Sequence, residues 1–200
     1  SLYLHITRGA APRNHAFPKE VVPTIFIMSS PLIVASKELI ITGVSAITAN
    51  DNRWSRCDIK AISLLPNVLL RQMASDSDAT ETLLLRDGFL SEGSASSIFI
   101  VKNKILLVPP KSNFTLPGIT YDVVLELAVK YQMPYEITEI SENDLRSSDE
   151  ILLASSTKEI MPITLLDGKK VGSGKPGEVF AQLYQLYQNF KISIMRRESI

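Results

Sequence analysis

A lysine within an apolar run is the first residue whose surroundings could make it reactive. Lys60 lies in the segment RWSRCDIKAI, residues 53–62, with apolar neighbours and with Arg53 and Arg56 close by. Apolar surroundings and nearby cations both favour the neutral amine of a lysine over its charged form. The neutral amine is the form that attacks a carbonyl to make a Schiff base. An isolated lysine is more often a solvated surface charge, so the segment alone leaves both interpretations open.

A carboxylate among small residues is a second candidate. Glu92 lies in the segment LSEGSASS, residues 90–97. The small side chains would let a flat ring approach the carboxylate closely. Taken alone, this pattern is more typical of an acidic residue in a surface turn.

Two segments could bind an anion. Residues 116–120, LPGIT, open a predicted helix, and the first backbone N–H groups of a helix are unpaired and attract anions. Gly118 would permit close approach, and the Thr120 hydroxyl would add a donor. Ser155 and Ser156 end a predicted strand and could supply more hydroxyl donors. Each feature is equally typical of an ordinary capped helix or strand end.

Arg13 and His15 follow a proline in a predicted loop. An arginine offers two parallel donors to a carboxylate, and the histidine offers another. A basic surface loop is the alternative. Cys57 has no histidine nearby in the sequence, so we expect it to pack rather than react.

These residues need a scaffold, and the apolar spacing predicts mostly strands. Many are joined by hairpin turns such as Asp87-Gly88, which predicts largely antiparallel sheets. A connector over residues 29–36 predicts a boundary between a lobe of residues 1–36 and a lobe of residues 37–200. We expect strands at 2–8, 21–28, 39–47, 82–85, 89–90, 98–101, 105–108, 135–140, 151–154, 161–166 and 169–171, and helices at 64–74 (capped by Ser63), 120–131 (capped by Thr120) and 176–190, with a short helix capped by Ser141.

Composition excludes several classes of protein. The 200 residues are 45% hydrophobic and carry 21 basic and 21 acidic side chains, so no net charge favours binding to nucleic acid or an anionic membrane. One cysteine and two histidines argue against a disulfide framework or a metal site. The longest apolar stretch, residues 21–36, contains two prolines and predicts no membrane span. We expect a cytoplasmic protein, and the start within a strand without methionine suggests a natural polypeptide that begins earlier.

In their order along the chain, the candidates resemble a known set of motifs. Residues 3–18, YLHITRGAAPRNHAFP, resemble a signature of bacterial D-amino-acid aminotransferases, and residues 53–69 resemble the segment that carries their cofactor lysine. The segments around Glu92, Thr120 and Ser156 complete the pattern. The chain is therefore similar to the class IV aminotransferases, which use pyridoxal phosphate (PLP) and share their fold with aminodeoxychorismate lyases.

The resemblance implies an α+β fold of type IV PLP enzymes. Residues 37–200 would form the large pseudo-barrel lobe of mostly antiparallel strands with helices. Residues 1–36 would supply the last strands of a small N-terminal α/β lobe, whose earlier part, with a phosphate-binding arginine, has no counterpart in this sequence. A homodimer is also implied.

The resemblance further implies roles for the candidate residues. Lys60 would form the Schiff base with PLP and then move the proton between the substrate Cα and C4′ of the cofactor. Glu92 would pair with the pyridine nitrogen, and Leu116 would pack on the ring. The phosphate would be held by Gly118, Ile119, Thr120, Ser155 and Ser156.

Arg13 and His15 would bind the substrate α-carboxylate from the other subunit of the dimer. The implied reaction transfers the amino group of a D-amino acid, D-alanine above all, to 2-oxoglutarate and gives pyruvate and D-glutamate. An aminodeoxychorismate lyase of the same fold, or an inactive fragment of either enzyme, is the alternative. Ser97 and Tyr121 depart from the family pattern, which has Asn and Arg at these positions, but neither replaces a residue given a role.

Overall fold

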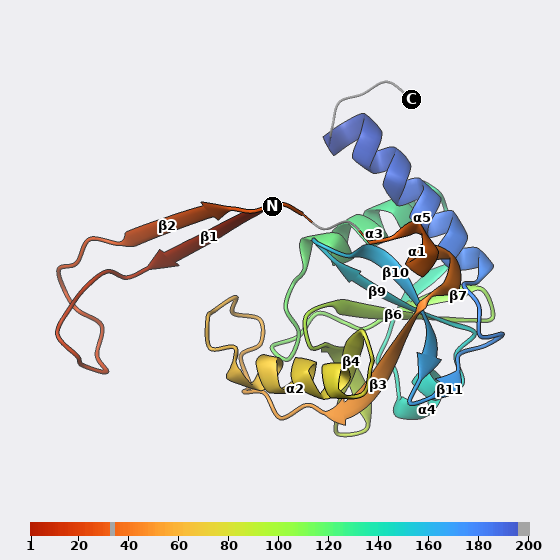
Figure 1. Ribbon diagram of the computed structural model, residues 1–200, viewed down its shortest axis with the longest axis horizontal. Helices are drawn as coiled ribbons and strands as arrows, with labels where there is room; N and C mark the ends of the chain where they lie inside the picture. Colours follow the sequence, from red (N-terminus) through yellow and green to blue (C-terminus); the bar gives the residue numbers. More distant parts are fainter. Residues whose placement is uncertain (33–34, 196–200) are drawn as a thin grey trace. The chain divides into compact units, whose positions relative to one another are not determined.

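A computed structural model describes residues 1–32 and 35–195, which divide into two compact units (Figure 1). Residues 1–32 form the first unit and residues 35–195 the second. Residues 33–34 belong to the predicted connector but lie outside the described residues. The lobe boundary at residues 36 and 37 therefore stays a prediction.

The first unit is one antiparallel hairpin of β1 (Leu2–Thr7) and β2 (Thr24–Ser29). Its strands pair in register from Leu2 opposite Ser29 to Thr7 opposite Thr24. Both strands were predicted, although the second begins only after Pro23, which has no N–H to donate. Apolar residues are exposed along both strands, and a lone two-stranded ribbon is marginal in water. That these strands are the last part of a larger lobe stays a prediction.

The second unit is built on one nine-stranded sheet, whose path runs β5-β4-β3-β10-β9-β6-β7-β8 with β11 beside β10. Most neighbours are antiparallel, as predicted, but β3 runs parallel to both β10 and β4, and β7 to β8. The strands are β3 (Val44–Asn50), β4 (Glu81–Arg86), β5 (Phe89–Gly93), β6 (Ser97–Lys102), β7 (Ile105–Val108), β8 (Tyr135–Ile137), β9 (Glu150–Ser155), β10 (Glu159–Leu166) and β11 (Lys169–Lys170).

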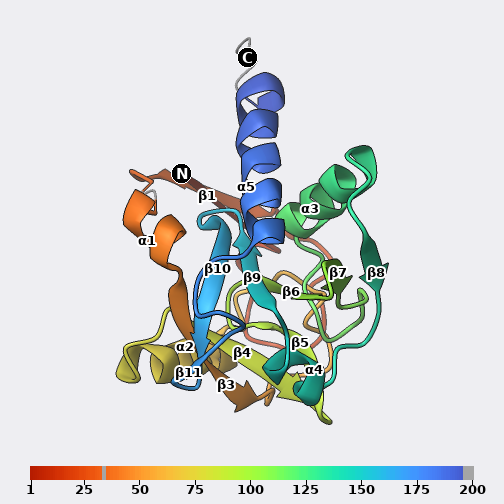
Figure 2. The same cartoon turned by 90° about the vertical axis from the view of Figure 1, so that its right-hand side faces the viewer.

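The sheet curls (Figure 2), and its β5 end bonds to the chain that follows β8 at the other end of the path. The Leu90 N–H of β5 donates to the carbonyl of Ile140, 2.8 Å away, and Phe89 forms a bridge with Ser141. Residues 140 and 141 lie just beyond β8, the opposite end of the sheet path. The α+β class and the predicted pseudo-barrel are both confirmed.

Alternation along the strands separates two cores. On β6, Ile98 and Ile100 face the cluster inside the curled sheet, whereas Phe99 and Val101 face a second cluster under two helices. Strands buried on both faces have continuous apolar runs, as here. The two covering helices are α3 (Ile119–Lys130) and α5 (Glu178–Phe190); the remaining helices are α1 (Lys37–Thr42), α2 (Leu65–Asp76), α4 (Glu142–Arg146) and the π-helical turn η1 (Lys191–Met195).

Local signals explain where the predicted elements were wrong. Residues 39–42, predicted as strand, belong to α1, because the Ser36 hydroxyl caps the Leu39 N–H at 3.3 Å and Gly43, at φ 78°, ends the helix before β3. Neither Ser63 nor Thr120 is an N-cap, because α2 begins after Leu64 and α3 after Gly118, and neither helix has a side-chain hydrogen bond at its cap. The prediction that Ser141 caps α4 is confirmed.

Every helix among the described residues is too short or too polar to cross a membrane.

Candidate active site

Several predicted site segments meet where β5 ends and β6 begins. Ser97, the first residue of β6, pairs with Ala154, next to the hydroxyl-bearing end of β9. On its other side, a Cβ added to Gly118 would lie 3.2 Å from the Ser97 Oγ. Glu92, Ser97 and Leu116 also line one small hollow. The fold therefore brings together the Glu92 segment, the start of α3 and the Ser155 segment, which are far apart in sequence.

Glu92 is held at both of its carboxylate oxygens. It lies on β5 with 7% of its surface exposed. The Arg53 guanidinium donates to Oε1, and the Leu116 backbone N–H donates to Oε2 at 3.1 Å. Burial raises the pKa of Glu92, and the hydrogen bond and charge of Arg53 oppose that rise. Glu92 is thus a buried, oriented carboxylate and not the surface-turn acid of the alternative interpretation.

Arg53 joins Glu92 to a second buried acid. Its Nε and Nη2 donate to the two oxygens of Asp51, each at a distance of 2.9 Å. Nη2 also donates to the Phe114 carbonyl at 3.1 Å. Burial raises the pKa of Asp51, but the hydrogen bonds and charge of Arg53 outweigh burial and lower it overall. Burial in turn disfavours charged Arg53, yet its two carboxylate partners leave the pKa of Arg53 raised. Asp51 and Arg53 therefore stay ionised beneath Glu92.

Lys60 lies on the same loop as Arg53, between β3 and α2. The Cys57 N–H donates to the Asn113 carbonyl at 2.8 Å, and the Asn113 side-chain amide donates back to the Ser55 carbonyl at 2.8 Å. Since Phe114 and Leu116 follow Asn113, these bonds fix the lysine loop beside the segment that contacts Glu92.

The environment predicted for Lys60 was wrong. Its side chain is exposed, as is Ile59, and within the described residues its amine makes no hydrogen bond. The two neighbouring cations are not free to act on it, because Arg53 pairs with Asp51 and Glu92, and Arg56 pairs with Asp58 at 2.9 Å. The amine is accessible. It is neither buried among apolar side chains nor close to an unpaired cation of Arg53 or Arg56.

The predicted phosphate segments present donors at the same place. No side chain caps the first turn of α3, so its N–H groups remain available to an anion. Ile119 is 73% exposed there, and Thr120 is buried. Ser155 is half-buried and accepts from the Lys158 N–H at 3.1 Å, and Ser156 is exposed.

Arg13 and His15 lie in the loop between β1 and β2 of the first unit, where both are exposed. Because the other candidate residues belong to the second unit, the role of this pair stays a prediction. Cys57 is buried and its thiol donates to the Trp54 carbonyl at 3.2 Å, as expected of a packing residue. Tyr121 is also buried, and its hydroxyl donates to the Pro109 carbonyl at 2.8 Å.

Sequence reasoning missed three residues at this corner. Arg53 was considered only as a charge near Lys60, not as the partner of Glu92. Glu81 and Lys158, which form an ion pair behind the Glu92 segment, were not considered at all. One signal was available: Glu81 is an acid directly before the strand expected at residues 82–85, two positions ahead of the apolar run Leu83 to Leu85.

Comparison with known proteins shows the family of this chain. The family model described as amino-transferase class IV matches residues 1–166. The chain is 38% identical over 192 residues to the D-alanine aminotransferase of Bacillus licheniformis, covering 96% of this chain and 68% of the relative. It is 36% identical over 189 residues to that of Staphylococcus epidermidis, covering 94% and 67%.

A solved structure gives the same result. The branched-chain amino acid aminotransferase of Escherichia coli superposes with a TM-score of 0.83 at 25% identity, covering 94% of this chain and 64% of that one. The chain thus spans about two thirds of the length of the proteins it matches. With a family match over most of its residues, this chain belongs to the class IV aminotransferases.

Proposed function

We propose that this protein transfers the amino group of a D-amino acid, D-alanine above all, to 2-oxoglutarate through PLP. The observation that carries the proposal is the buried Glu92, which Arg53 and the Leu116 N–H orient beside the lysine loop and the start of α3. Similarity to D-alanine aminotransferases over 94–96% of the chain supports the choice of substrate.

The donor groups at this corner fit PLP. An accessible lysine amine suits its aldehyde, a buried carboxylate suits its pyridine nitrogen, and an uncapped helix start with nearby hydroxyls suits its phosphate. When bound, PLP supplies a carbonyl that condenses with amines and a ring that accepts electrons from the substrate Cα. In this proposal Lys60, Glu92 and Leu116 hold the ring, and the phosphate is held by Gly118, Ile119, Thr120, Ser155 and Ser156.

Lys60 acts in two ways in this proposal. Its amine would hold the cofactor covalently in the resting enzyme, and once freed it would carry the proton between the substrate Cα and C4′ of the cofactor. Exposure of the side chain leaves the amine free to do both, because no partner within the described residues competes for it.

Glu92 keeps the pyridine nitrogen protonated. The carboxyl group must be ionised for its charge to favour the protonated ring nitrogen, although burial alone favours its neutral form. Arg53 counteracts burial by donating to one oxygen, and the Leu116 N–H holds the other. Arg53 is therefore the residue that makes a buried Glu92 suitable for this role.

Arg13 and His15 select the substrate by binding its α-carboxylate, and we propose that they do so across the interface of a homodimer in the cytoplasm. The motif in residues 3–18 supports the first role, and the exposure of both side chains in the β1–β2 loop is compatible with it.

The function is tested by supplying D-alanine with 2-oxoglutarate and, separately, aminodeoxychorismate alone. We expect pyruvate and D-glutamate from the first mixture, with a shift in the absorbance of bound cofactor on addition of D-alanine. Pyruvate from aminodeoxychorismate alone, with D-alanine left untouched, would replace the aminotransferase by the lyase.

Glu92→Gln should bind PLP but lose turnover. The amide keeps the shape of the side chain but cannot hold the ring nitrogen as a charged pair, so kcat should fall roughly a hundredfold or more. Cofactor absorbance measures binding, and pyruvate release measures turnover. An unchanged kcat would contradict the electron-accepting arrangement.

Arg13→Met should raise KM for both D-alanine and 2-oxoglutarate, because one site must bind the carboxylates of both substrates in turn. Loss of a charged hydrogen bond of about 1.5–3 kcal/mol corresponds to a roughly ten- to hundredfold rise. The absorbance of bound cofactor should not change. Arg8→Met, in the same unit, is the control, and a KM change for only one substrate would contradict a shared carboxylate site.

A further inference from the structure

We propose that Glu81 and Lys158 form a positioning pair that holds the ring-binding and phosphate-binding segments in register. This inference rests on the proposed function. Glu81 is the first residue of β4 and has no exposed surface, although a buried carboxylate is costly unless donors surround it. Besides the adjacent Thr82 N–H at 3.0 Å, the donors to Glu81 come from two segments of the site, and neither Glu81 nor Lys158 touches substrate in the proposal.

One pair of donors comes from the segment that follows Glu92. The Ser94 hydroxyl donates to Oε1 of Glu81, and the Ser96 hydroxyl donates to Oε2 at 2.8 Å. The backbone is drawn so close that a Cβ added to Gly93 would lie 3.2 Å from the Glu81 carboxyl carbon. Since Gly93 is the residue after Glu92, Glu81 fixes the end of the strand that carries Glu92.

The charged donor to Glu81 comes from the segment that follows Ser155. Lys158 lies in the turn between β9 and β10, and its Nζ is 3.3 Å from Oε2 of Glu81. Its backbone N–H donates to the hydroxyl of Ser155, one of the proposed phosphate residues, at 3.1 Å. Glu81 therefore connects the Glu92 segment directly to the Ser155 segment.

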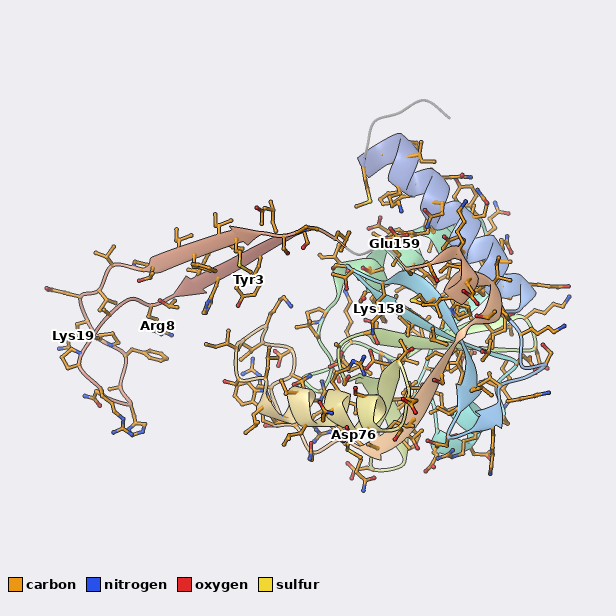
Figure 3. All side chains as sticks on the ribbon, viewed as in Figure 1. Tyr3, Arg8, Lys19, Asp76, Lys158 and Glu159 are labelled. Atoms are coloured by element: carbon orange, nitrogen blue, oxygen red, sulfur yellow. The ribbon has the colours of Figure 1, made fainter. Side chains whose placement is uncertain are left out.

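The same turn is fixed from its other side. Glu159, next to Lys158 (Figure 3), accepts from the Gln188 amide at 2.8 Å and from the Lys191 amine at 2.5 Å. Its backbone adopts φ 57°, as a tight turn between paired strands requires. With α5 and η1 on one side and Glu81 on the other, the turn has few ways to move independently of Glu92.

The link between the Glu92 segment and the Ser155 segment affects catalysis because PLP is a rigid ligand. The ring nitrogen and the phosphate of PLP lie at opposite ends of one small molecule, so Glu92 can pair with the nitrogen only if the phosphate donors stand at the matching distance. A misplacement of about 1 Å can cost about a hundredfold in rate. The Glu81–Lys158 pair is placed to prevent such a shift.

The first test uses hydrogen exchange in the cofactor-free protein. Lys158→Met leaves Glu81 buried without its cation, and we expect exchange at residues 93–96 to quicken about tenfold, although the hydrogen bonds of Lys158 go to Ser155 and Glu81 and not to those residues. Lys158→Arg should restore slow exchange. The control is Lys104→Met, because the amine of Lys104 lies 3.4 Å from Glu178 in an exposed ion pair.

The second test measures PLP binding and kinetics. Lys158→Met should raise the Kd for PLP about tenfold and lower kcat, with the KM for D-alanine little changed, and Glu81→Gln should act in the same direction. Faster exchange confined to residues 155–159, or an unaltered Kd for PLP, would overturn the positioning role alone. A wild-type protein that takes up no PLP would instead contradict the proposed function, and the positioning role with it.

Discussion

Lys60→Met should abolish transamination, with a loss of at least about 10⁴-fold in kcat. The substitution keeps the length of the side chain and removes the amine, which in the proposed mechanism both binds the cofactor and moves the proton. General acid–base catalysis alone is worth roughly 10²–10⁴-fold, and the covalent role adds to it. The folded state should be little affected, because the side chain is exposed.

Chemical trapping identifies the lysine independently of turnover. After incubation with PLP and reduction with borohydride, peptide mapping should place a pyridoxyl group on Lys60. The accessible amine predicts that this labelling needs no unfolding. Lys175→Met is the matched control, because Lys175 is also an exposed lysine. A pyridoxyl group on a different lysine of the wild-type protein would show that Lys60 was the wrong choice.

Local chemistry made the hairpins predictable. Asp87 and Gly88 adopt φ values of 52° and 84°, the left-handed region that their residue types tolerate and that a two-residue hairpin turn requires. The strands on either side, β4 and β5, follow from the turn. The same applies to α4, where Ser141 caps the helix it precedes.

The apolar pattern alone gave a wrong prediction where capping residues favoured a helix. The run Leu39 to Ile41 is as apolar as a strand, yet Ser36 and Gly43 supply a cap and a left-handed stop that favour one short helix. A strand over residues 39–47 would have needed Gly43 inside it. The capping residues were present in the sequence and carried the better signal.

The site itself depends on contacts that no spacing encodes. Arg53 reaches Glu92 across 39 positions and Lys158 reaches Glu81 across 77, in each case because the sheet brings the two segments together. Resemblance to a family supplied the residues that face the ligand. The residues behind them were visible only once the fold placed buried acids next to their cations.

Arg53→Met should be the most destabilising single substitution at this site. It would leave Glu92, which has 9% of its side chain exposed, without its cation, and it would leave Asp51, whose side chain is fully inaccessible, with Arg86 alone at 3.2 Å among the described residues. Removing one partner of a buried ion pair costs about 3–5 kcal/mol. Urea denaturation at neutral pH should show this loss in the free energy of unfolding.

The pH dependence of that loss follows from the two acids. In the wild-type protein Arg53 lowers the pKa of Asp51, so the stability that Asp51 contributes is present above its unfolded pKa and fades as the pH falls. Without Arg53, no cation among the described residues opposes the rise that burial causes in the pKa of Glu92, and Arg86 alone opposes the same effect on Asp51. The variant should then gain stability as the pH falls and the acids take up protons.

The difference in unfolding free energy between wild-type protein and Arg53→Met should therefore be largest near pH 7 and should shrink as the pH approaches about 4, the ordinary range of carboxyl groups. Arg56→Met is the control, since Arg56 pairs with Asp58 in solvent and its loss should change little at any pH. Arg53→Lys keeps the charge but cannot donate to both acids at once, so it should fall between the two. A loss that is small, or equally large at both pH values, would mean that Arg53 does not keep Asp51 and Glu92 ionised, and Glu92 would then need another source of the charge proposed for it.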